Sequence, residues 1–384
     1  MSAGTDPQAP VAFALPHITD DDVDAVARVL RSGWLSTGAE CAALEGALAE
    51  RVQAPHVVAV SSCTAALQIS VASLRLPRGA RVGVPTWTFV ASASSIVHTG
   101  AVPVLLDVDE DTLNVSPAAV EAAIAEGLDA LMVVHFAGTP VDPKVFELAA
   151  DAGIPVIEDA AHALGASDDR GPISGVGTVS ACYSFYATKN LTSAEGGALA
   201  THDEKLARYA SSQRLHGLSN DAWGRYRIGA VTDYDVVEPG FKANLPDVLA
   251  ALAHSQLRRF DEMQARRREV VTRYRSVLEP LDGCRIVPGP PDPRSADHLF
   301  VLVLPEGIER SEVTSVMAAA AIGTSVHFRP VHTFTWYREH ALIGPSGVAV
   351  AERMAPRTLS LPLHAGLSDH DVDRVLETLV GILS

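Results

Sequence analysis

Apolar segments that alternate with helical patterns, from about residue 57 to residue 200, constrain the fold of this chain more than any other feature. Each apolar segment has the length of a buried strand, and each gap between them holds a stretch with helical periodicity. Strands of this kind joined by helices form mostly parallel sheets that are covered on both faces. The chain is therefore expected to have an α/β fold with a large, mostly parallel sheet. The strand segments are HVVAVSS, RVGVP, VPVLLDV, ALMVVHFAG and IPVIED.

The sequence changes character near residue 240. Residues 245–278 predict one long amphipathic helix, and the shorter segments that follow, closed by a C-terminal helix, are typical of a small α+β domain. A length of 384 residues also favours two domains, because a single hydrophobic core stops growing at about 250–300 residues. We expect N-terminal helices and a large α/β domain in residues 1–240, and a small C-terminal α+β domain in residues 241–384.

Two local signals refine this division. Thr19, which is followed by acidic residues, predicts the N-cap of a helix that precedes the sheet. The polar segment from Leu218 to Pro239 joins the two domains, and loops of this length are usually functional or disordered.

The chain is acidic, with 46 Asp and Glu residues against 30 Lys and Arg residues and a formal net charge of -16. Nucleic acids and anionic membranes are bound by clustered basic side chains, so neither is expected as a partner. No apolar run is long enough to cross a bilayer, and the N-terminus lacks the pattern of a signal peptide. The four cysteines have no disulfide or metal-ligand spacing. These features predict a cytoplasmic protein with reduced cysteines.

Lys189 lies in the segment SFYATKNLTSAEGGALA, among small and hydroxylated residues. The segments on either side, VSACYSFY and GGALATHD, predict short strands, which places Lys189 in a turn between them. A lysine in such a turn is expected to lose hydration, which lowers its pKa toward the range in which the neutral amine attacks a carbonyl. The alternative is an exposed loop lysine. The residues at the ends of the neighbouring predicted strands help to decide between the two.

Other chemically active groups follow the ends of the predicted strands, where ligands gather in open parallel sheets. SSCTAAL brings Thr64 and free backbone amides to a helix N-terminus, which suits a phosphate dianion. Asp159 ends a buried strand, and a buried carboxylate requires a cation or a protonated nitrogen as its partner. His162 follows three residues later, and Ser184 stands at the next strand end.

A phosphate site, a buried acid and a dehydrated lysine are what pyridoxal 5'-phosphate (PLP) requires. Trp87, at another strand end, either lies flat on the cofactor ring or is a core aromatic residue. His162 either contacts the ring hydroxyl of the cofactor or is a hydrogen-bonded structural histidine. The sequence alone leaves both alternatives open.

Other cofactors and metals fit the sequence poorly. The nearest match to a dinucleotide-binding fingerprint, GVGTVS from Gly175, precedes a strand instead of following one. The chain has no GxxxxGK[ST] loop and no HExxH helix, and no metal site is expected.

The chain resembles the DegT/DnrJ/EryC/StrS family of PLP-dependent sugar aminotransferases, from about residue 12 to the C-terminus. The resemblance implies the PLP-dependent transferase fold of aspartate aminotransferase type I, with a large, mostly parallel-sheet domain and a small C-terminal α+β domain. It rests on these segments, in this order along the chain: GWLSTG, SSCTAAL, PTWTFVAS, VHFAGTP, IEDAAHALGA, SFYATKNLTSAEGG, RLHG, EPGFKANLPDVLAAL and VHFRPVH.

The resemblance assigns a role to each group at the strand ends. Lys189 is implied as the Schiff-base lysine, and Asp159 as the partner of the pyridine nitrogen. Thr64, the backbone amide of Ala65 and Ser184 are implied to hold the phosphate.

Three further residues take roles by the same resemblance. Trp87 is implied to stack on the ring, and His162 stands where the family has Gln or His. Asn244 matches the residue that reaches the phosphate of the neighbouring subunit, which implies a homodimer with shared active sites. Ala243 stands where the family usually has an aromatic residue.

The resemblance is greatest to enzymes that install a 4-amino group on nucleotide-linked sugars. It implies transfer of an amino group from L-glutamate to a dTDP-4-keto-6-deoxyhexose, which gives a 4-amino-4,6-dideoxy sugar nucleotide, with pyridoxamine phosphate present during turnover. The alternatives are a 3-keto sugar or amino-cyclitol aminotransferase, a PLP-dependent sugar dehydratase, and a non-catalytic regulatory protein. The candidate substrate-binding residues are Lys242, Arg225, Arg227, His327 and Arg329.

Overall fold

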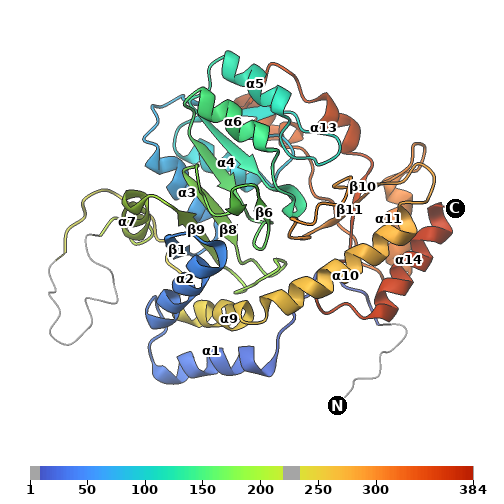
Figure 1. The fold of residues 1–384 in the computed structure, drawn as a ribbon, viewed down its shortest axis with the longest axis horizontal. Helices are drawn as coiled ribbons and strands as arrows, with labels where there is room; N and C mark the ends of the chain where they lie inside the picture. The colour runs from blue at the N-terminus through green and yellow to red at the C-terminus, as the bar shows by residue number, and fades with distance from the viewer. Residues whose placement is uncertain (1–8, 219–233, 384) are drawn as a thin grey trace.

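The computed structural model describes residues 9–218 and 234–383. Figure 1 shows a large sheet flanked by helices, and a smaller sheet beside the C-terminal helices. The predicted strands and the helices between them are confirmed, and so is the α/β class.

The large sheet has eight strands in the order β1-β9-β8-β5-β4-β2-β3-β12. Its neighbouring strands are parallel except in the two pairs that include β9. The carboxyl ends of β1, β8, β5, β4 and β2 therefore lie along one edge of the sheet. The strands are β1 (His56–Val60), β2 (Arg81–Pro85), β3 (Val102–Leu106), β4 (Ala130–Val134), β5 (Val156–Asp159), β8 (Ser180–Ser184), β9 (Gly197–Thr201) and β12 (Leu342–Ile343).

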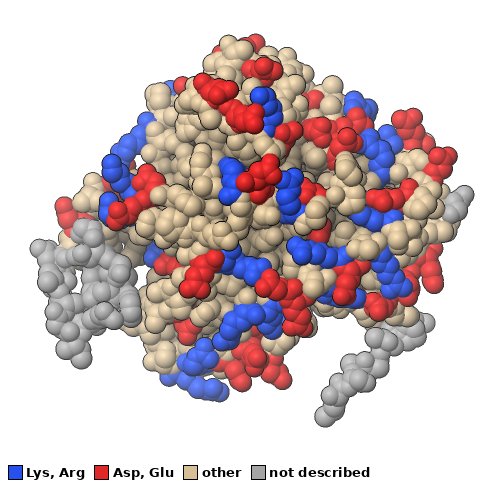
Figure 2. Space-filling view, in the orientation of Figure 1, with Lys and Arg blue, Asp and Glu red and all other residues tan. Residues whose placement is uncertain are grey.

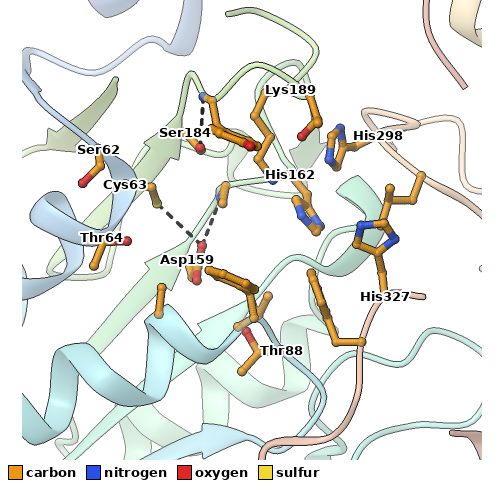
Figure 3. Close-up of a pocket in the computed structure, with 18 of the residues that line it drawn as sticks. Ser62, Cys63, Thr64, Thr88, Asp159, His162, Ser184, Lys189, His298 and His327 are labelled. Atoms are coloured by element: carbon orange, nitrogen blue, oxygen red, sulfur yellow. Dashed lines mark hydrogen bonds between the residues drawn. The ribbon is translucent and has the colours of Figure 1, made fainter. Parts of the chain in front are cut away.

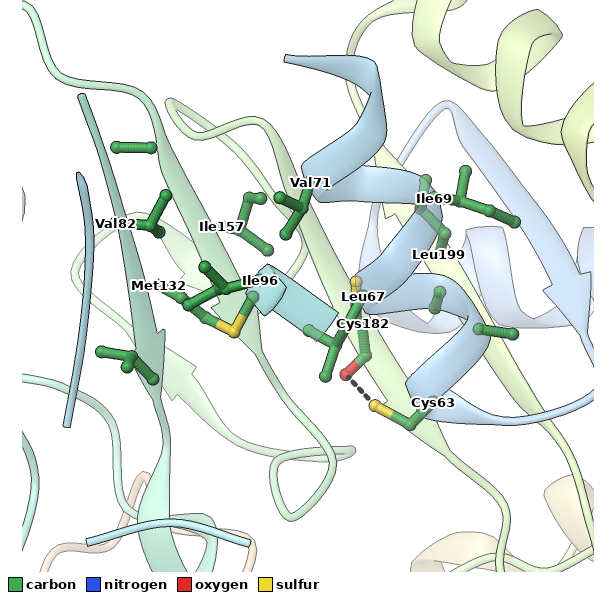
Figure 4. Close-up of a cluster of buried hydrophobic side chains, with 14 of the residues drawn as sticks. Cys63, Leu67, Ile69, Val71, Val82, Ile96, Met132, Ile157, Cys182 and Leu199 are labelled. Atoms are coloured by element: carbon green, nitrogen blue, oxygen red, sulfur yellow. Dashed lines mark hydrogen bonds between the residues drawn. The ribbon is translucent and has the colours of Figure 1, made fainter. Parts of the chain in front are cut away.

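Helices bury both faces of this sheet, as continuous apolar strands require. In Figure 4, Leu67, Ile69 and Val71 of α3 lie with Met132 and Ile157 of the central strands. The alternate residues of the same strands face the cluster under α5 and α6. The helices of this domain are α1 (Asp20–Ser32), α2 (Ala39–Val52), α3 (Cys63–Ser73), α4 (Val90–His98), α5 (Pro117–Ala125), α6 (Pro143–Asp151) and α7 (Glu204–Gln213).

The N-terminal helix begins where the sequence predicts. Thr19 is the N-cap of α1, and its backbone N–H donates to the Asp22 carboxylate at 3.0 Å. This bond satisfies a backbone donor at the point where the chain enters the helix.

The prediction of one helix over residues 245–278 is wrong, because two helices form in its place. Helix α9 (Asp247–Leu257) packs against α1 and α2, whereas α10 (Phe260–Leu278) packs against α14. Arg259 lies at the junction, where its guanidinium donates to the Asp22 carboxylate and to the carbonyl of His17, each at 2.8 Å. The amphipathic pattern continues through the junction because each of the two helices has an apolar face, and each face packs against different helices.

The C-terminal part forms a second core around a three-stranded antiparallel sheet, with α10, α11 and α14 beside it (Figure 1). Its strands are β10 (Arg285–Val287), β11 (Phe300–Val303) and β13 (Thr358–Leu361), and its later helices are α11 (Arg310–Ala319), α12 (Thr335–His340), α13 (Ala349–Met354) and α14 (Asp369–Leu383). The division at residue 241 stays a prediction. Two elements beyond it, α9 and β12, contact the N-terminal part. The short pair β6 (Ser167–Asp168) and β7 (Gly171–Pro172) follows β5.

Acidic and basic side chains are interspersed over the face shown in Figure 2. Many of them form ion pairs, such as that of Arg285 with Glu110 at 2.6 Å. An exposed ion pair contributes about 0–1 kcal/mol, so the buried clusters and not these pairs dominate the stability of the fold.

Candidate functional site

A cavity of about 450 Å³ lies at the edge of the large sheet where the parallel strands end. It is lined by residues that follow four of the strands, together with residues from the C-terminal part. In the view of Figure 3, Ser62 and Thr64 lie on the left, three histidines lie on the right, and Asp159, Ser184 and Lys189 lie between them. The lining residues are Phe13, Ala14, Ser62, Cys63, Thr64, Leu67, Thr88, Phe89, Ala91, Val134, Asp159, Ala161, His162, Ser184, Tyr186, Thr188, Lys189, Glu195, Gly196, His298, Leu299, His327, Phe328 and Leu363.

Lys189 lies in the turn between β8 and β9, as the sequence predicts. Its backbone N–H donates to the carbonyl of Tyr186 at 2.9 Å. The next residue, Asn190, is buried and donates to Gln264 at 3.0 Å and to the carbonyl of Ala296 at 2.7 Å. These bonds attach the lysine turn to α10 and to the segment before β11.

Burial lowers the pKa of Lys189 from 10.5 to about 8, although the charge of Asp159 opposes the shift. A pKa near 8 leaves part of the amine neutral at physiological pH. The side chain is half-buried in the cavity wall, so it is not the exposed loop lysine of the alternative.

Asp159 ends β5 and is 5% exposed. Its Oδ2 accepts a hydrogen bond from the Ser92 hydroxyl at 2.7 Å, and its Oδ1 accepts one from the backbone N–H of Ala161 at 3.1 Å. Burial raises the pKa of the carboxyl, while these hydrogen bonds and the charge of Lys189 oppose the rise. A carboxylate accepts more than two hydrogen bonds, so Asp159 can also hold a protonated nitrogen within the cavity.

The N-terminus of α3 borders the cavity next to the first strand. Ser62 caps this helix, because its Oγ accepts from the backbone N–H of Ala65 at 3.1 Å. Thr64 lines the cavity, and its hydroxyl has no hydrogen-bond partner in residues 9–218 or 234–383. A helix N-terminus with an unpaired hydroxyl is suited to an anion. Ala65 does not line the cavity, and its amide is already used by the cap.

The strand after the lysine turn starts with a glycine for a steric reason. A Cβ atom on Gly197 would lie 2.5 Å from the backbone nitrogen of Cys63. The absence of a side chain therefore lets β9 approach the start of α3 closely. Ser184, at the end of β8, also lines the cavity, and its hydroxyl accepts from the backbone N–H of Tyr186 at 3.3 Å.

Neutral imidazoles form the wall opposite the hydroxyl groups. His162 accepts a hydrogen bond at Nδ1 from the backbone N–H of Ala137 at 3.3 Å, and its ring stacks on Phe328 with the centroids 5.8 Å apart. Burial lowers the pKa of His162 well below its ordinary value, and the charge of Lys189 lowers it further. His327 forms a hydrogen bond through Nδ1 with the Ser360 hydroxyl at 3.0 Å, and burial lowers its pKa to about 4.

The prediction that Trp87 lies on the cofactor ring is wrong in this structure. Trp87 is 0% exposed, packs edge-on against Phe136 with the centroids 6.3 Å apart, and does not line the cavity. It is a core aromatic residue, which was the alternative. Phe89, two residues later, lines the cavity and is 59% exposed at the N-cap of α4. The two aromatic residues flank Thr88, and the fold buries the larger one.

Only one of the candidate substrate-binding residues that the structure describes lines the cavity. His327 lines the cavity, whereas Lys242 and Arg329 are exposed and do not line the cavity of their own chain. Arg329 donates to Thr333, and Lys242 donates to Asn244. Two further candidates, Arg225 and Arg227, lie outside the described residues.

Asn244 is also absent from the cavity of its own chain. Its Nδ2 donates to the Thr37 hydroxyl at 2.7 Å. The predicted role of Asn244 in a neighbouring subunit stays a prediction.

Phe89 and His298 are two of the lining residues that the sequence analysis did not name. Phe89 had a signal, since it lies in the same PTWTFVA segment as Trp87. His298 precedes β11 in the C-terminal part, where no predicted strand of the large sheet ends. Nothing in its local sequence distinguishes His298 from a structural histidine.

The residues around the cavity fit PLP. Asp159 is a buried acceptor for a ring nitrogen, Lys189 is a dehydrated amine, and the α3 N-terminus with Thr64 offers unpaired donors for a phosphate. Within the described ranges, no group of three or more His, Cys, Asp or Glu residues is arranged to hold a metal ion. None of the described helices combines the length and the apolar character needed to cross a membrane.

Comparisons with known proteins identify the family of the chain. The sequence model of the DegT/DnrJ/EryC1/StrS aminotransferase family matches residues 16–380. The spore coat polysaccharide biosynthesis protein SpsC of Bacillus subtilis (strain 168) is 40% identical over 376 residues, which cover 97% of this chain and 96% of SpsC.

Solved structures of a similar protein contain the cofactor that the cavity fits. The putative sugar aminotransferase Spr1654 of Streptococcus pneumoniae, in its pyridoxamine phosphate form, is 31% identical with a TM-score of 0.89. In its PLP form it is 29% identical with a TM-score of 0.88. Each comparison covers 97% of this chain and 98% of the other.

Proposed function

Because the chain belongs to the DegT/DnrJ/EryC1/StrS aminotransferase family, we propose that it moves the amino group of L-glutamate to a nucleotide-linked keto sugar. It is a PLP-dependent sugar aminotransferase with the PLP-dependent transferase fold. The proposed acceptor is a dTDP-4-keto-6-deoxyhexose, and the product is a 4-amino-4,6-dideoxy sugar nucleotide. A similar protein is named for spore coat polysaccharide biosynthesis, which supports an acceptor from carbohydrate metabolism.

The observation that carries the proposal is the presence of Lys189 and Asp159 in one cavity, with the pKa of the lysine near 8. Bound PLP supplies an electron sink for the negative charge that develops at the reacting carbon. Asp159 holds the proton on the ring nitrogen. Lys189 Nζ accepts the proton from the α-carbon of glutamate and later returns a proton to the sugar carbon. A base with a pKa near the working pH carries out both transfers efficiently.

Other lining residues would hold the cofactor and orient its ring. Thr64, Ser184 and the free amides of the α3 N-terminus bind the phosphate group. His162, whose Nδ1 already accepts from Ala137, presents its Nε2–H to the ring hydroxyl. Phe89, which lines the cavity, would pack against the ring of bound PLP in the role predicted for Trp87.

The proposed substrates are anionic, and this cavity has few cations. Among its described lining residues, Lys189 is the only lysine or arginine, and two are carboxylates, Asp159 and Glu195. The carboxylates of glutamate and the diphosphate of a sugar nucleotide therefore require basic groups from elsewhere. We assign this role to Lys242 and Arg329, which are exposed outside the cavity, and to Arg225 and Arg227.

A homodimer with shared active sites supplies such groups. Phe89 and Tyr186 line the cavity and are 59% and 48% exposed, so the mouth of the cavity presents apolar surface that a second copy would cover. Asn244 and Lys242 lie side by side and away from the cavity of their own chain. In the proposed dimer they serve the cavity of the partner.

The test uses the enzyme first converted to its amino form with L-glutamate and then freed of amino acid. This form is incubated with TDP-, UDP- and GDP-linked 3-keto and 4-keto sugars and with a keto-cyclitol, and each product is identified by NMR. We expect a 4-amino sugar nucleotide as the main product, and no product from a Lys189→Ala control. Exclusive amination of a 3-keto sugar or of the cyclitol, elimination without amination, or no reaction at all would refute the proposed acceptor.

A further inference from the structure

His298 forms part of the wall of the cavity, and nothing above assigns it a role. It precedes β11, is 5% exposed and lines the cavity. Its ring centroid is 4.3 Å from that of His162, and Figure 3 shows it at the end of the cavity where Lys189 lies. The hydroxyls of Ser62 and Thr64 lie at the opposite end in this view. His298 therefore lies at the end of the cavity where Lys189 would react with the substrate, and not at the end where the α3 N-terminus would bind the phosphate.

A chain of buried hydrogen bonds fixes which ring nitrogen of His298 carries the proton. The carbonyl of Ala296 accepts from Nε2 of Gln264 and from Nδ2 of Asn190, so both amide side chains turn their nitrogens toward it. The second N–H of Asn190 donates to Gln264 Oε1 at 3.0 Å. Both amide hydrogens of Asn190 are then used, and its Oδ1 is left as an acceptor. Since Asn190 Oδ1 lies 2.9 Å from His298 Nδ1, that nitrogen carries the proton.

The ring of His298 is neutral at physiological pH. Burial lowers its pKa well below the ordinary value, and the charge of Lys189 lowers it further. A neutral ring that is protonated at Nδ1 has a lone pair at Nε2. Nε2 has no hydrogen-bond partner among the residues that the structure describes. His162 is the opposite case, because Nδ1 is its acceptor and the proton is at Nε2.

We propose that His298 Nε2 accepts a hydrogen bond from a sugar hydroxyl next to the reacting carbonyl, and that His298 is a specificity-determining residue for the keto sugar. The proposal rests on the proposed function, since it names a contact to that substrate. A neutral acceptor attracts a hydroxyl donor and repels a carboxylate, so it favours the keto sugar and contributes nothing to the binding of glutamate. Sites that hydrogen-bond a substrate hydroxyl discriminate strongly against analogues that lack it.

Two variants of His298 and one control separate this role from a structural one. His298→Phe keeps a ring of similar size but has no acceptor, whereas His298→Gln has an amide oxygen that can accept. His364 is the matched control, because it is also 5% exposed and lies in the same part of the chain but does not line the cavity. The two half-reactions are followed by cofactor absorbance, and thermal melting of each variant reports its folding.

We expect His298→Phe to lower kcat/KM for the keto sugar by about 10- to 100-fold and to change the glutamate half-reaction by less than about threefold. His298→Gln should recover most of the loss, and His364→Phe should leave kcat/KM for the sugar unchanged. With a sugar that lacks the neighbouring hydroxyl, wild type and His298→Phe should react at the same rate. An unchanged sugar half-reaction in His298→Phe, or equal losses in both half-reactions, would overturn the proposal.

Nitrogen-15 NMR of the enzyme labelled at its histidine rings gives a second readout that does not depend on turnover. The signals that disappear in His298→Gln should be those of a neutral ring protonated at Nδ1. A ring protonated at Nε2 would overturn the proposal. Failure of the proposed function is seen differently, because the wild-type enzyme would then aminate none of the keto sugars before any variant is tested.

Discussion

The amine of Lys189 should react as a neutral nucleophile near physiological pH in the cofactor-free enzyme. Burial lowers its pKa from 10.5 to about 8. At about pH 7, a pKa of 8 leaves about one amine in ten neutral, whereas a pKa of 10.5 leaves about three in ten thousand. The structure therefore predicts a gain in neutral amine of roughly 300-fold at this position.

Competitive labelling measures this gain directly. A trace acylating reagent, which reacts only with neutral amines, is added to the cofactor-free enzyme at a series of pH values, and each lysine peptide is quantified by mass spectrometry. The chain has four lysines, and the three others, Lys144, Lys205 and Lys242, are exposed and act as internal standards.

The labelling of Lys189 should rise with pH and reach half its maximum near pH 8, because deprotonation produces the reactive form. Lys144, whose pKa is raised by its hydrogen bond to Glu147, should reach half its maximum at a clearly higher pH. The same midpoint for Lys189 and Lys144 would refute the argument that burial tunes the pKa of Lys189.

Three further predictions concern the groups around this amine. Asp159→Asn should slow both half-reactions by about 10²- to 10³-fold, seen by cofactor absorbance, while the cofactor still binds; an unimpaired rate would contradict its role. Phe89→Ala should weaken cofactor retention in dialysis by about tenfold at unchanged stability, whereas Trp87→Ala should lower the free energy of unfolding in urea by about 3–5 kcal/mol. The reverse pattern would restore Trp87 to the cofactor site. Thr64→Val should weaken cofactor affinity by about 10- to 100-fold in a fluorescence titration, and Thr64→Ser should retain most of it; equal affinities of Thr64→Val and wild type would remove the hydroxyl from the phosphate site.

The strand ends were predictable from sequence because they depend on local patterns. The segments that became β5 and β8 are short and buried along their whole length, and Asp159 and Ser184 end them. In a parallel sheet the strand ends meet at one edge, so the juxtaposition of Asp159 with Lys189 followed from the topology.

Two predictions from the sequence were wrong because the structure at those positions depends on contacts between residues that are distant in sequence. Trp87 and Phe89 lie two residues apart, and the packing of Trp87 against Phe136 decides which of them reaches the cavity. The junction between α9 and α10 at Arg259 depends on Asp22, which is more than 200 residues away. Neither contact leaves a periodic signal in its own segment.

His298 was missed for a related reason. It enters the cavity from the C-terminal part of the chain, and its orientation depends on Asn190 and Gln264, which come from the lysine turn and from α10. A histidine ahead of a short apolar strand is ordinary in sequence. Its position beside Lys189 emerges only when the two parts of the chain pack together.

The most direct test of this account is to locate the covalent attachment of the cofactor. The enzyme loaded with PLP is reduced with borohydride, digested, and analysed by mass spectrometry. We predict one pyridoxyl group, on the peptide that contains Lys189, and none on the peptides of the three exposed lysines. A pyridoxyl group on Lys144, Lys205 or Lys242, or no attachment to the chain, would contradict the assignment of this cavity as the active site.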